Sequence, residues 1–417
     1  MRRPVINCLL SAALFLAAVG FLSCRRERLV VYDTPQMAVE RQFWVRVLLA
    51  ECVEQSTLKI RGHFSVLGAS GVTIVPETIF DQPGLPMEVK VSAAGLNIAG
   101  RNFVAMEVTI LPDEPHIFTV DGADYRGKLL IKANNDYTTF DLVNIVPLES
   151  YLSGVVTAEM PAYWQAEALK AQAIAARTYC LFNRKKFENI RHWDVKKTTE
   201  SQVYLGVRGE TPQSWKAVND TWGQVLVCTQ NGAEGLFPAY YSSSCGGHTE
   251  NAKNVFGDSF SALAGADCPY CKEVAKPSIF FWPMAQFDKT EVKTAVQLKY
   301  PKLKAFADIA NIVSTKQSDY SGFSRLTLVK LEDSKGRSDF LRAEDLRLTL
   351  DPSGNRLRST ACKIVNMQGR FSFVSGRGYG HGVGLCQCGA EGMARRGKNA
   401  SEILSHYYPG SKLTRVY

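Results

Sequence analysis

The pattern of hydrophobic and polar positions changes near residue 147, from short alternating runs to helical spacing. Between residues 41 and 140, apolar or alternating runs are separated by Gly, Pro, Asn and Asp residues, which is typical of β-strands joined by turns. Strands are predicted at residues 43–49, 87–91, 103–110, 116–120 and 128–131, with another at 137–145.

Two helices are predicted after this strand-rich part. Apolar side chains recur at helical spacing over 148–156, directly after Pro147, which suits the first turn of a helix. An alanine-rich pattern then predicts a longer helix over about 163–187. The break between them holds Glu159, followed by Met160 and Pro161.

Glu159 is the candidate catalytic residue. Burial among apolar and aromatic neighbours favours the neutral form of a carboxyl group. A neutral acid near neutral pH can donate a proton to a leaving group. Two other acidic residues of the segment, Glu149 and Glu167, lie within helical patterns and are expected to face solvent.

The rest of the chain alternates between strands, loops and short helices. Strands are predicted at 225–228 and 238–243, followed by a loop with paired glycines. A side subdomain is expected to contain helices at 289–298 and 343–348 and a strand at 324–331, and no chemistry is assigned to it. The tail has alternating glycines over 376–384, which let the backbone pass close to another strand or an extended ligand, and then short helices at 391–396 and 401–408.

These patterns predict an α+β fold in which a strand-rich region wraps around a central two-helix catalytic segment, with a small α/β side subdomain. The predicted boundaries are residues 1–24 for a targeting segment, 30–140 for the strand-rich part, 141–275 for the catalytic core, 276–355 for the side subdomain and 356–417 for the glycine-rich end of the core.

Composition narrows the functional classes. The chain has 417 residues, of which 46% are hydrophobic, so a sizeable core is available. The net charge of +9 suits an acidic polymer or an anionic membrane surface. The basic residues are scattered and form no zinc-finger, helix-turn-helix or RNP pattern, so nucleic acid is not an expected partner.

The N-terminus predicts export. Arg2 and Arg3 precede an apolar run over 9–22, which reads as a secretory signal and is short for a permanent membrane helix. The sequence ending at Cys24 resembles a lipoprotein box, although Leu22 departs from it. Lipid attachment at Cys24, plain cleavage and an uncleaved anchor therefore stay open. The expected location is the periplasmic or cell-wall face of the membrane.

The cysteines predict a structural zinc. Cys245-x-x-His248 and Cys268-x-x-Cys271 form two ligand pairs whose spacing suits a tetrahedral ion. Cys386 or Cys388, in the tail, could supply a ligand in place of His248, and with Cys386 the set would be all sulfur. Disulfides or free thiols are the alternative, since export permits disulfides. The ligand set looks closed and the chain has no HExxH pattern, so zinc would orient the site and is not required for the chemistry.

Several motifs recur together in the order known from one family. They are YLSGVVTAEMP, EALKAQAIAARTY, SSSCGGHTEN, NVFG and GRGYGHGVGLCQCGAEGMARRG. With weaker similarity elsewhere, they resemble the SpoIID/LytB family of bacterial cell-wall proteins. The resemblance implies a peptidoglycan lytic transglycosylase whose catalytic glutamate is Glu159 and whose preferred strands have lost their stem peptides. Other members are described as amidase enhancers, so a non-catalytic peptidoglycan-binding enhancer of an N-acetylmuramoyl-L-alanine amidase is the alternative. Sporulation, cell division and wall turnover all stay open as the process.

The implied chemistry needs one carboxylate, whereas hydrolytic glycosidases usually need two. The acid protonates the glycosidic oxygen, and the carboxylate then takes a proton from the muramoyl 6-hydroxyl, which closes on the anomeric carbon as a 1,6-anhydro sugar. Aromatic faces and polar side chains near Glu159 would bind the glycan. Gln172 and Arg177 are expected to project toward the break. The full set of substrate-binding candidates is Gln172, Arg177, Tyr179, Ser243, Tyr379 and His381.

Overall fold

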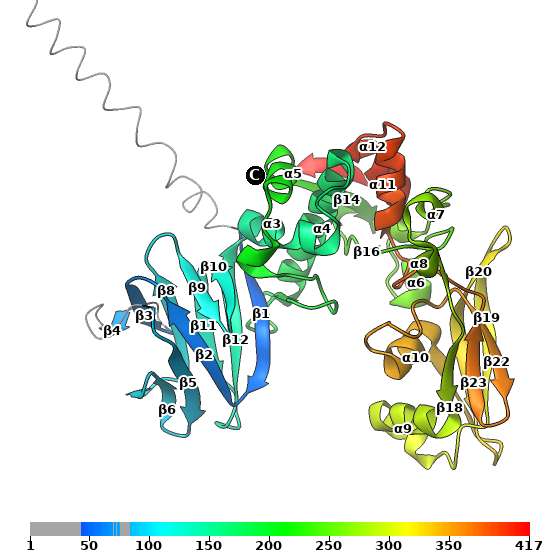
Figure 1. Ribbon diagram of the computed structural model, residues 1–417, viewed down its shortest axis with the longest axis horizontal. Helices are drawn as coiled ribbons and strands as arrows, with labels where there is room; N and C mark the ends of the chain where they lie inside the picture. Colours follow the sequence, from blue (N-terminus) through cyan, green and yellow to red (C-terminus); the bar gives the residue numbers. More distant parts are fainter. Residues whose placement is uncertain (1–42, 70, 72, 76–83) are drawn as a thin grey trace, which may run out of the picture. The chain divides into compact units, whose positions relative to one another are not determined.

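The fold is α+β, as predicted, in a computed structural model that describes residues 43–69, 71, 73–75 and 84–417 (Figure 1). The predicted targeting segment and Cys24 lie outside the described residues. None of the helices in the described ranges is both long and apolar enough to cross a bilayer.

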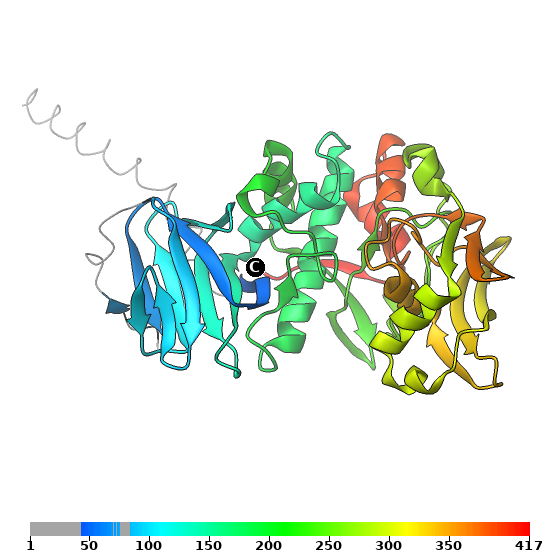
Figure 2. The same cartoon turned by 60° about the horizontal axis from the view of Figure 1, so that its bottom comes forward.

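Two large sheets form the N-terminal part (Figures 1 and 2). The first has the order β13-β1-β12-β11-β8-β3-β4 and the second the order β10-β9-β2-β5-β6-β7. β1 and β13 pair in parallel, whereas the neighbours from β12 to β4 in the first sheet and all neighbours in the second sheet are antiparallel. The strands of the first sheet are β1 (Trp44–Val53), β3 (Phe64–Gly68), β4 (Thr73–Val75), β8 (Glu107–Pro112), β11 (Lys128–Ala133), β12 (Phe140–Pro147) and β13 (Val195–Lys196). Those of the second are β2 (Gln55–Ile60), β5 (Met87–Ser92), β6 (Gly95–Ile98), β7 (Arg101–Phe103), β9 (Ile117–Val120) and β10 (Ala123–Arg126).

Strict alternation of buried and exposed side chains shows why these residues form half-buried strands. In β8, Val108 and Ile110 are fully buried while the residues between them are partly exposed. In β2, Leu58 and Ile60 are buried in the same alternating way. A sheet with one buried face needs another layer to cover that face. Here the two sheets pack face to face and cover each other (Figure 1).

The run at 103–110 is not one strand, which corrects the prediction. Phe103 ends β7 in one sheet, and β8 starts at Glu107 in the other. Between them Val104 is 98% exposed although it is apolar. The chain crosses between layers here, and a run of apolar letters does not reveal such a crossing.

The two predicted helices are present as α3 (Leu148–Glu159) and α4 (Ala166–Phe187). Helix α3 ends just before Pro161, because the residue before a proline is driven out of helical backbone geometry. Helix α4 packs against α3, α5 (Pro212–Asp220), α11 (Gln387–Arg395), α12 (Ala400–Tyr407) and β14 (Gln224–Gln230). Its buried alanines allow these close approaches.

Short elements connect α4 with the tail. Two of them, β16 (Tyr241–Ser242) and β25 (Leu385–Cys386), pair in parallel and bring the predicted Ser-Gly loop against the glycine-rich tail. A Cβ on Gly378 would lie 2.5 Å from the carbonyl oxygen of Ser244, so only glycine allows this approach. The other short elements here are η3 (Gly206–Gly209), β15 (Ala233–Leu236), α6 (Ala252–Val255), η4 (Ser261–Leu263), α7 (Cys271–Val274), β17 (Phe281–Trp282), β24 (Gly376–Arg377) and β26 (Lys412–Arg415).

The side subdomain has its own hydrophobic core. Phe287 and Val292 share this core with Phe371 and Phe373, which come from beyond the predicted boundary at residue 355. Residues that follow the boundary therefore complete its sheets. Its elements are α8 (Pro277–Phe280), β18 (Ala285–Asp288), α9 (Lys289–Lys299), η5 (Pro301–Ala305), β19 (Asn311–Tyr320), β20 (Phe323–Glu332), β21 (Ser338–Arg342), α10 (Ala343–Leu350), β22 (Lys363–Met367) and β23 (Arg370–Val374).

Candidate active site and thiol cluster

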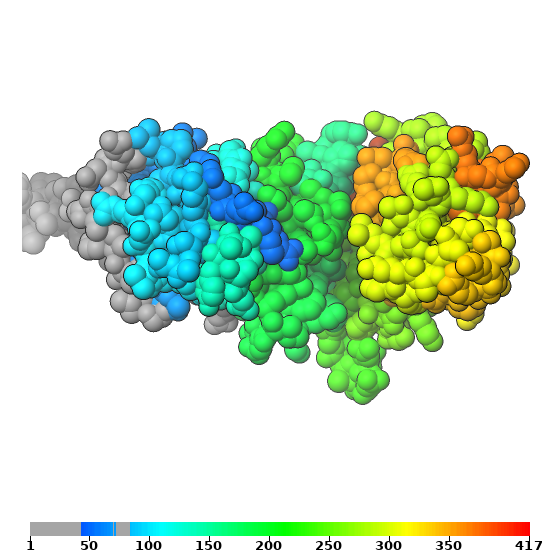
Figure 3. Space-filling model, turned by 90° about the horizontal axis from the view of Figure 1, so that it is seen from below, coloured from blue at the N-terminus to red at the C-terminus, as the bar shows by residue number. Residues whose placement is uncertain are grey.

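A cavity of about 550 Å³ lies between the end of α3, the loop before η3, β16, the glycine-rich tail and α10. In the space-filling view of Figure 3, the yellow and orange residues of the side subdomain adjoin the green residues of the helical segment on this face. The side subdomain, to which no chemistry was assigned, therefore forms part of the wall. The cavity has the size of many small-ligand sites. Its lining includes Glu159, Tyr179, Thr199, Glu200, Ser201, Tyr240, Tyr241, Ser242, Ser243, Phe256, Glu344, Arg347, Gly354, Tyr379, His381 and Gln387.

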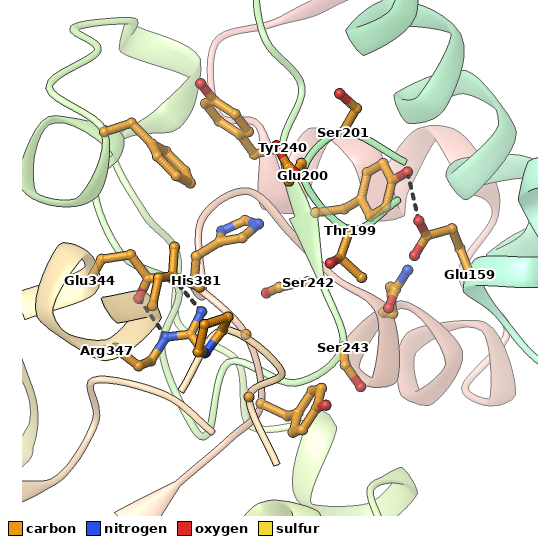
Figure 4. A pocket seen from close by; sticks show the side chains of 18 of the residues that line it. Glu159, Thr199, Glu200, Ser201, Tyr240, Ser242, Ser243, Glu344, Arg347 and His381 are labelled. Atoms are coloured by element: carbon orange, nitrogen blue, oxygen red, sulfur yellow. Dashed lines mark hydrogen bonds and ion pairs between the residues drawn. The ribbon is translucent and has the colours of Figure 1, made fainter. Parts of the chain in front are cut away.

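Glu159 is the last residue of α3, and its carboxyl group lines one side of the cavity (Figure 4). The backbone N–H of Val203 donates to its Oε1 at 2.7 Å, and the hydroxyl of Tyr241 donates to the same oxygen at 3.4 Å. Burial raises the pKa of Glu159, while hydrogen bonds from Val203, Gln387 and Tyr241 lower it. Burial prevails, so the pKa lies above its ordinary value.

The environment of Glu159 comes from tertiary neighbours. Tyr163, which follows it in sequence, is 81% exposed, whereas Met160 is buried. The groups that hydrogen-bond the carboxyl group are those of Val203, Tyr241 and Gln387. Distant parts of the chain therefore supply its polar contacts.

Four of the predicted substrate-binding residues line the cavity with Glu159. They are Tyr179, Ser243, Tyr379 and His381. The ring of His381 is packed edge-on against Tyr240 and Phe256, at centroid distances of 5.9 and 5.1 Å. Burial lowers the pKa of His381 to about 4, so the ring is neutral at neutral pH.

Arg177 does not project toward Glu159, which corrects the prediction. Its Nε and Nη2 donate to the two carboxylate oxygens of Glu149 at 2.8 and 2.6 Å, and both side chains are almost completely buried. Glu149 therefore does not face solvent either. A buried guanidinium needs a paired carboxylate, and Glu149 lies on the neighbouring helix α3.

Gln172 is also absent from the cavity lining. It is fully buried, and its Oε1 accepts a hydrogen bond from Gln387 Nε2 at 3.4 Å. It therefore lies behind Gln387, which itself neighbours Glu159. Glu167 behaves closer to expectation, since it is partly exposed and bonds to Lys170.

Three cavity features were not predicted from the sequence. Tyr241 and Gln387 hydrogen-bond Glu159, and the Glu344–Arg347 pair forms the opposite side (Figure 4). Gln387 stands inside one of the recurrent motifs as an amide in a cysteine- and glycine-rich stretch. That position was a usable signal, whereas Arg347 sits in an ordinary amphipathic helix, and its one signal was the weaker family similarity at Leu346 and Arg347.

Four buried thiols come together beside the cavity. The sulfur atoms of Cys245, Cys268, Cys271 and Cys386 all lie within 4.8 Å of one another. Cys245 Sγ and Cys271 Sγ are 3.8 Å apart. A disulfide needs about 2.0 Å, whereas two thiolates on a tetrahedral zinc, at about 2.3 Å from the ion, lie about 3.8 Å apart. All nine cysteines of the described residues are free thiols, so the disulfide alternative finds no support in this part of the chain.

His248 is not a member of this group. Of the two ligand sets predicted from the sequence, the geometry therefore fits the one with Cys386. The His248 ring stacks on Tyr320 at 3.7 Å, and Nδ1 contacts the carbonyl oxygen of Thr249 at 2.6 Å. The tail residue Cys386 takes the fourth position in its place.

A buried arginine beside the thiols fits a charged metal centre. Arg325 is completely buried, and its Nη2 donates to the carbonyl oxygen of Cys245 at 2.7 Å. Its Nε and Nη1 have no hydrogen-bond partner among the described residues. Four thiolates around a zinc ion carry a net negative charge, which would offset this buried cation. The donor set and its surroundings therefore fit zinc.

Comparisons with known proteins agree with these motifs. The sequence model of a family described as Stage II sporulation protein (SpoIID) matches residues 136–228, which include α3, α4 and Glu159. An uncharacterized protein of Brachyspira hyodysenteriae is 31% identical over 382 residues, which cover 89% of this chain and 93% of that protein.

Two relatives from Bacillus subtilis have descriptive names. The amidase enhancer is 27% identical over 387 residues, covering 85% of this chain but only 53% of the relative, so this chain matches about half of that protein. Stage II sporulation protein D is 29% identical over 289 residues, which cover 66% of this chain and 76% of the relative. With the ordered motifs and the α3–α4 site, these matches show that the chain belongs to the SpoIID/LytB family.

Proposed function

We propose that this protein is an exported lytic transglycosylase that cleaves peptidoglycan glycan strands lacking stem peptides and leaves 1,6-anhydro-muramoyl ends. The observation that carries the proposal is Glu159, a largely enclosed carboxyl group with a raised pKa on the wall of a 550 Å³ cavity. Such a group keeps a proton to higher pH than an ordinary glutamate and can act as a general acid.

In the proposed mechanism Glu159 acts twice. It first donates its proton to the glycosidic oxygen as the bond to the muramoyl anomeric carbon breaks. The hydrogen bonds from Val203 N–H and Tyr241 O–H then stabilise the carboxylate that forms. That carboxylate accepts the proton of the muramoyl 6-hydroxyl, whose oxygen bonds to the anomeric carbon, so Glu159 returns to its starting state.

The other carboxylates of the cavity favour this single-acid chemistry. Glu344 is held by both carboxylate oxygens against Arg347, at 2.6 and 2.9 Å. Glu200 is 68% exposed and pairs with Lys196. Hydrolysis would need a second carboxylate free to activate water or to attack the sugar, and Glu344, the buried one of the two, is not free.

Replacement of Glu159 tests the assignment. Glu159→Gln keeps the shape and removes the proton donor, so the cleavage rate should fall by about 10²–10⁴-fold. The assay digests stem-peptide-free strands and counts 1,6-anhydro-muramoyl ends by mass spectrometry. Glu167→Gln, on the adjoining helix and outside the cavity, is the matched control.

Two outcomes would replace the proposal. Full cleavage by Glu159→Gln would remove this residue from the mechanism. If the wild-type protein forms no anhydro ends but stimulates an N-acetylmuramoyl-L-alanine amidase, the function indicated by the name of the amidase enhancer would apply instead.

We also propose that Cys245, Cys268, Cys271 and Cys386 hold a structural zinc ion. Four thiolates close the coordination sphere, so the ion would fix the loop after β16 against α7 and the tail. It would hold the cavity wall in place, while the proton transfers belong to Glu159.

A further inference from the structure

The cavity has an asymmetric distribution of charge. Among the residues that line it, Arg347 is the one permanent cation, whereas Glu159, Glu200 and Glu344 are acidic. His381, with its lowered pKa, adds no positive charge at neutral pH. Figure 4 places Arg347 and Glu344 on the side of the cavity opposite Glu159.

The guanidinium of Arg347 is fixed but not saturated. Nε and Nη2 each donate to a carboxylate oxygen of Glu344, and Nη1 donates to the carbonyl oxygen of Leu357 at 3.3 Å. These bonds use three of the five N–H groups of an arginine. One N–H on Nη1 and one on Nη2 remain, and these donors can bind a second carboxylate.

The loop after α10 leaves room beside this end. Gly354 has φ +67°, and a Cβ there would lie 3.4 Å from Arg347 Nη1 and 3.8 Å from the hydroxyl oxygen of Tyr379. Any side chain at position 354 would therefore pack directly against both polar groups. Glycine keeps the Nη1 atom and the Tyr379 hydroxyl uncovered at the same point of the cavity wall.

Glu344 acts as a rigid support for this arrangement. Burial raises the pKa of Glu344, but Arg347 more than reverses this effect, so the pKa lies below its ordinary value and the group stays ionised. The pair lies on α10 with little exposure, at 8% and 5% for the two side chains. The guanidinium plane is thus held in one orientation before any ligand arrives, which lowers the cost of binding.

We propose that Arg347 forms a carboxylate-binding subsite that recognises the free lactyl carboxylate of a muramoyl residue in the glycan strand. This inference rests on the proposed function and adds the reason for its substrate preference. In an intact strand the stem peptide occupies that carboxyl group as an amide. Removal of the peptide exposes an anion, and the end of Arg347 provides two donors for it.

The test compares two substrates that differ only in this group. One is the stem-peptide-free strand, and the other is the same strand with its lactyl carboxylates converted to methylamides. A charge-assisted hydrogen-bonded contact contributes about 1.5–3 kcal/mol, so wild-type protein should prefer the carboxylate strand by about 10- to 100-fold in kcat/KM. Arg347→Gln should reduce this ratio to about one, with little change on the methylamide strand.

Matched variants separate recognition from structure. Glu344→Gln breaks the same ion pair but leaves the cation, so it should weaken the preference without abolishing it, because the guanidinium loses the support that orients it. Arg342→Gln removes another arginine at the start of α10, which pairs with Asp345 outside the cavity, and should keep the full preference. If Arg347→Gln fails to fold, the double variant Glu344→Gln/Arg347→Gln removes both buried charges together and should lose the preference.

Measuring the affinity for the two strands tests the subsite independently of cleavage. If wild-type protein cleaves neither strand, the proposed activity fails, and calorimetric affinities for the two strands then decide the subsite. A carboxylate preference that Arg347→Gln abolishes supports it in either assay. Equal treatment of the two strands by wild-type protein, or a preference that survives Arg347→Gln, overturns it.

Discussion

At the residue scale, the protonation state of Glu159 is a balance that individual neighbours can shift. Burial favours the neutral acid, and donors from Val203, Gln387 and Tyr241 favour the carboxylate. The acid must be protonated at the start of the proposed reaction and ionised in its middle. The raised pKa favours the first state, and the hydrogen-bond donors stabilise the second.

Tyr241→Phe should move the pH profile of cleavage upward. The hydroxyl of Tyr241 donates to Glu159 Oε1 and lowers the pKa of that carboxyl group, so its loss raises the pKa further. The protonated acid then persists to higher pH, and the basic limb of kcat/KM should shift in that direction. Tyr240→Phe, whose hydroxyl bonds to Asp258, is the control and should leave this limb in place. A downward shift in Tyr241→Phe would contradict the argument.

The raised pKa also has a consequence for stability. A glutamate whose folded-state pKa exceeds its unfolded value binds more protons when folded, so its contribution to stability is lost as pH rises through that range. The enclosed acid thus costs some stability at neutral pH, which is a common property of catalytic groups.

At the scale of elements, the joint between α3 and α4 depends on the Glu149–Arg177 pair. Both side chains are buried, and Arg177 also donates to the carbonyl oxygen of Gln224 at 3.1 Å, which links the helices to β14. The pair holds the two helices that flank the break with Glu159. Its role is therefore structural, and it differs from the glycan contact expected for Arg177.

Arg177→Gln should lower the free energy of unfolding by about 3–5 kcal/mol, because it leaves the Glu149 carboxylate buried with the Tyr417 hydroxyl but without its cationic partner. Equilibrium urea unfolding measures this change. Lys216→Gln, which breaks an exposed pair with Asp220 on α5, should stay within about 1 kcal/mol of the wild type. Equal effects of the two variants would show that the buried pair has no special role.

The same scale shows where local pattern was sufficient and where it was not. The alanine-rich run predicted α4 well, because helical periodicity over 22 residues is a strong local signal. The single strand expected at 103–110 was wrong, because an apolar run does not show that the chain changes sheets within it. The helix around Arg347 was predicted, but its position on the cavity depends on how the side subdomain packs.

At the scale of the whole described chain, the thiol cluster joins segments that are distant in sequence. Cys245 and Cys386 are 141 positions apart, and the side subdomain lies between them. A metal at this point would link the two chain segments that lead into and out of the side subdomain. It would thereby hold α10, with Arg347, against the part of the cavity that contains Glu159.

Metal analysis should find one zinc ion per chain, and Cys271→Ser should lose most of it because the set then has three thiolates. Cys388→Ser is the control, since Cys388 is a buried thiol on α11 outside the group of four. Removal of zinc by a chelator should lower the melting temperature of the wild-type protein. Full zinc content in Cys271→Ser would exclude this ligand set.

The sequence by itself determined the α+β character, the two central helices with Glu159 between them, the recurrent motifs and the cysteine pairs. These are features of residue type and local spacing, and local physics is sufficient to read them. Tertiary structure alone decided that Arg177 pairs with Glu149, that Cys386 and not His248 joins the thiols, and that Tyr241, Gln387 and Arg347 share a cavity with Glu159. Each of these contacts depends on which side chains face each other after distant segments pack. Local periodicity does not predict these contacts, because a buried polar side chain pairs with whichever partner the fold places within reach.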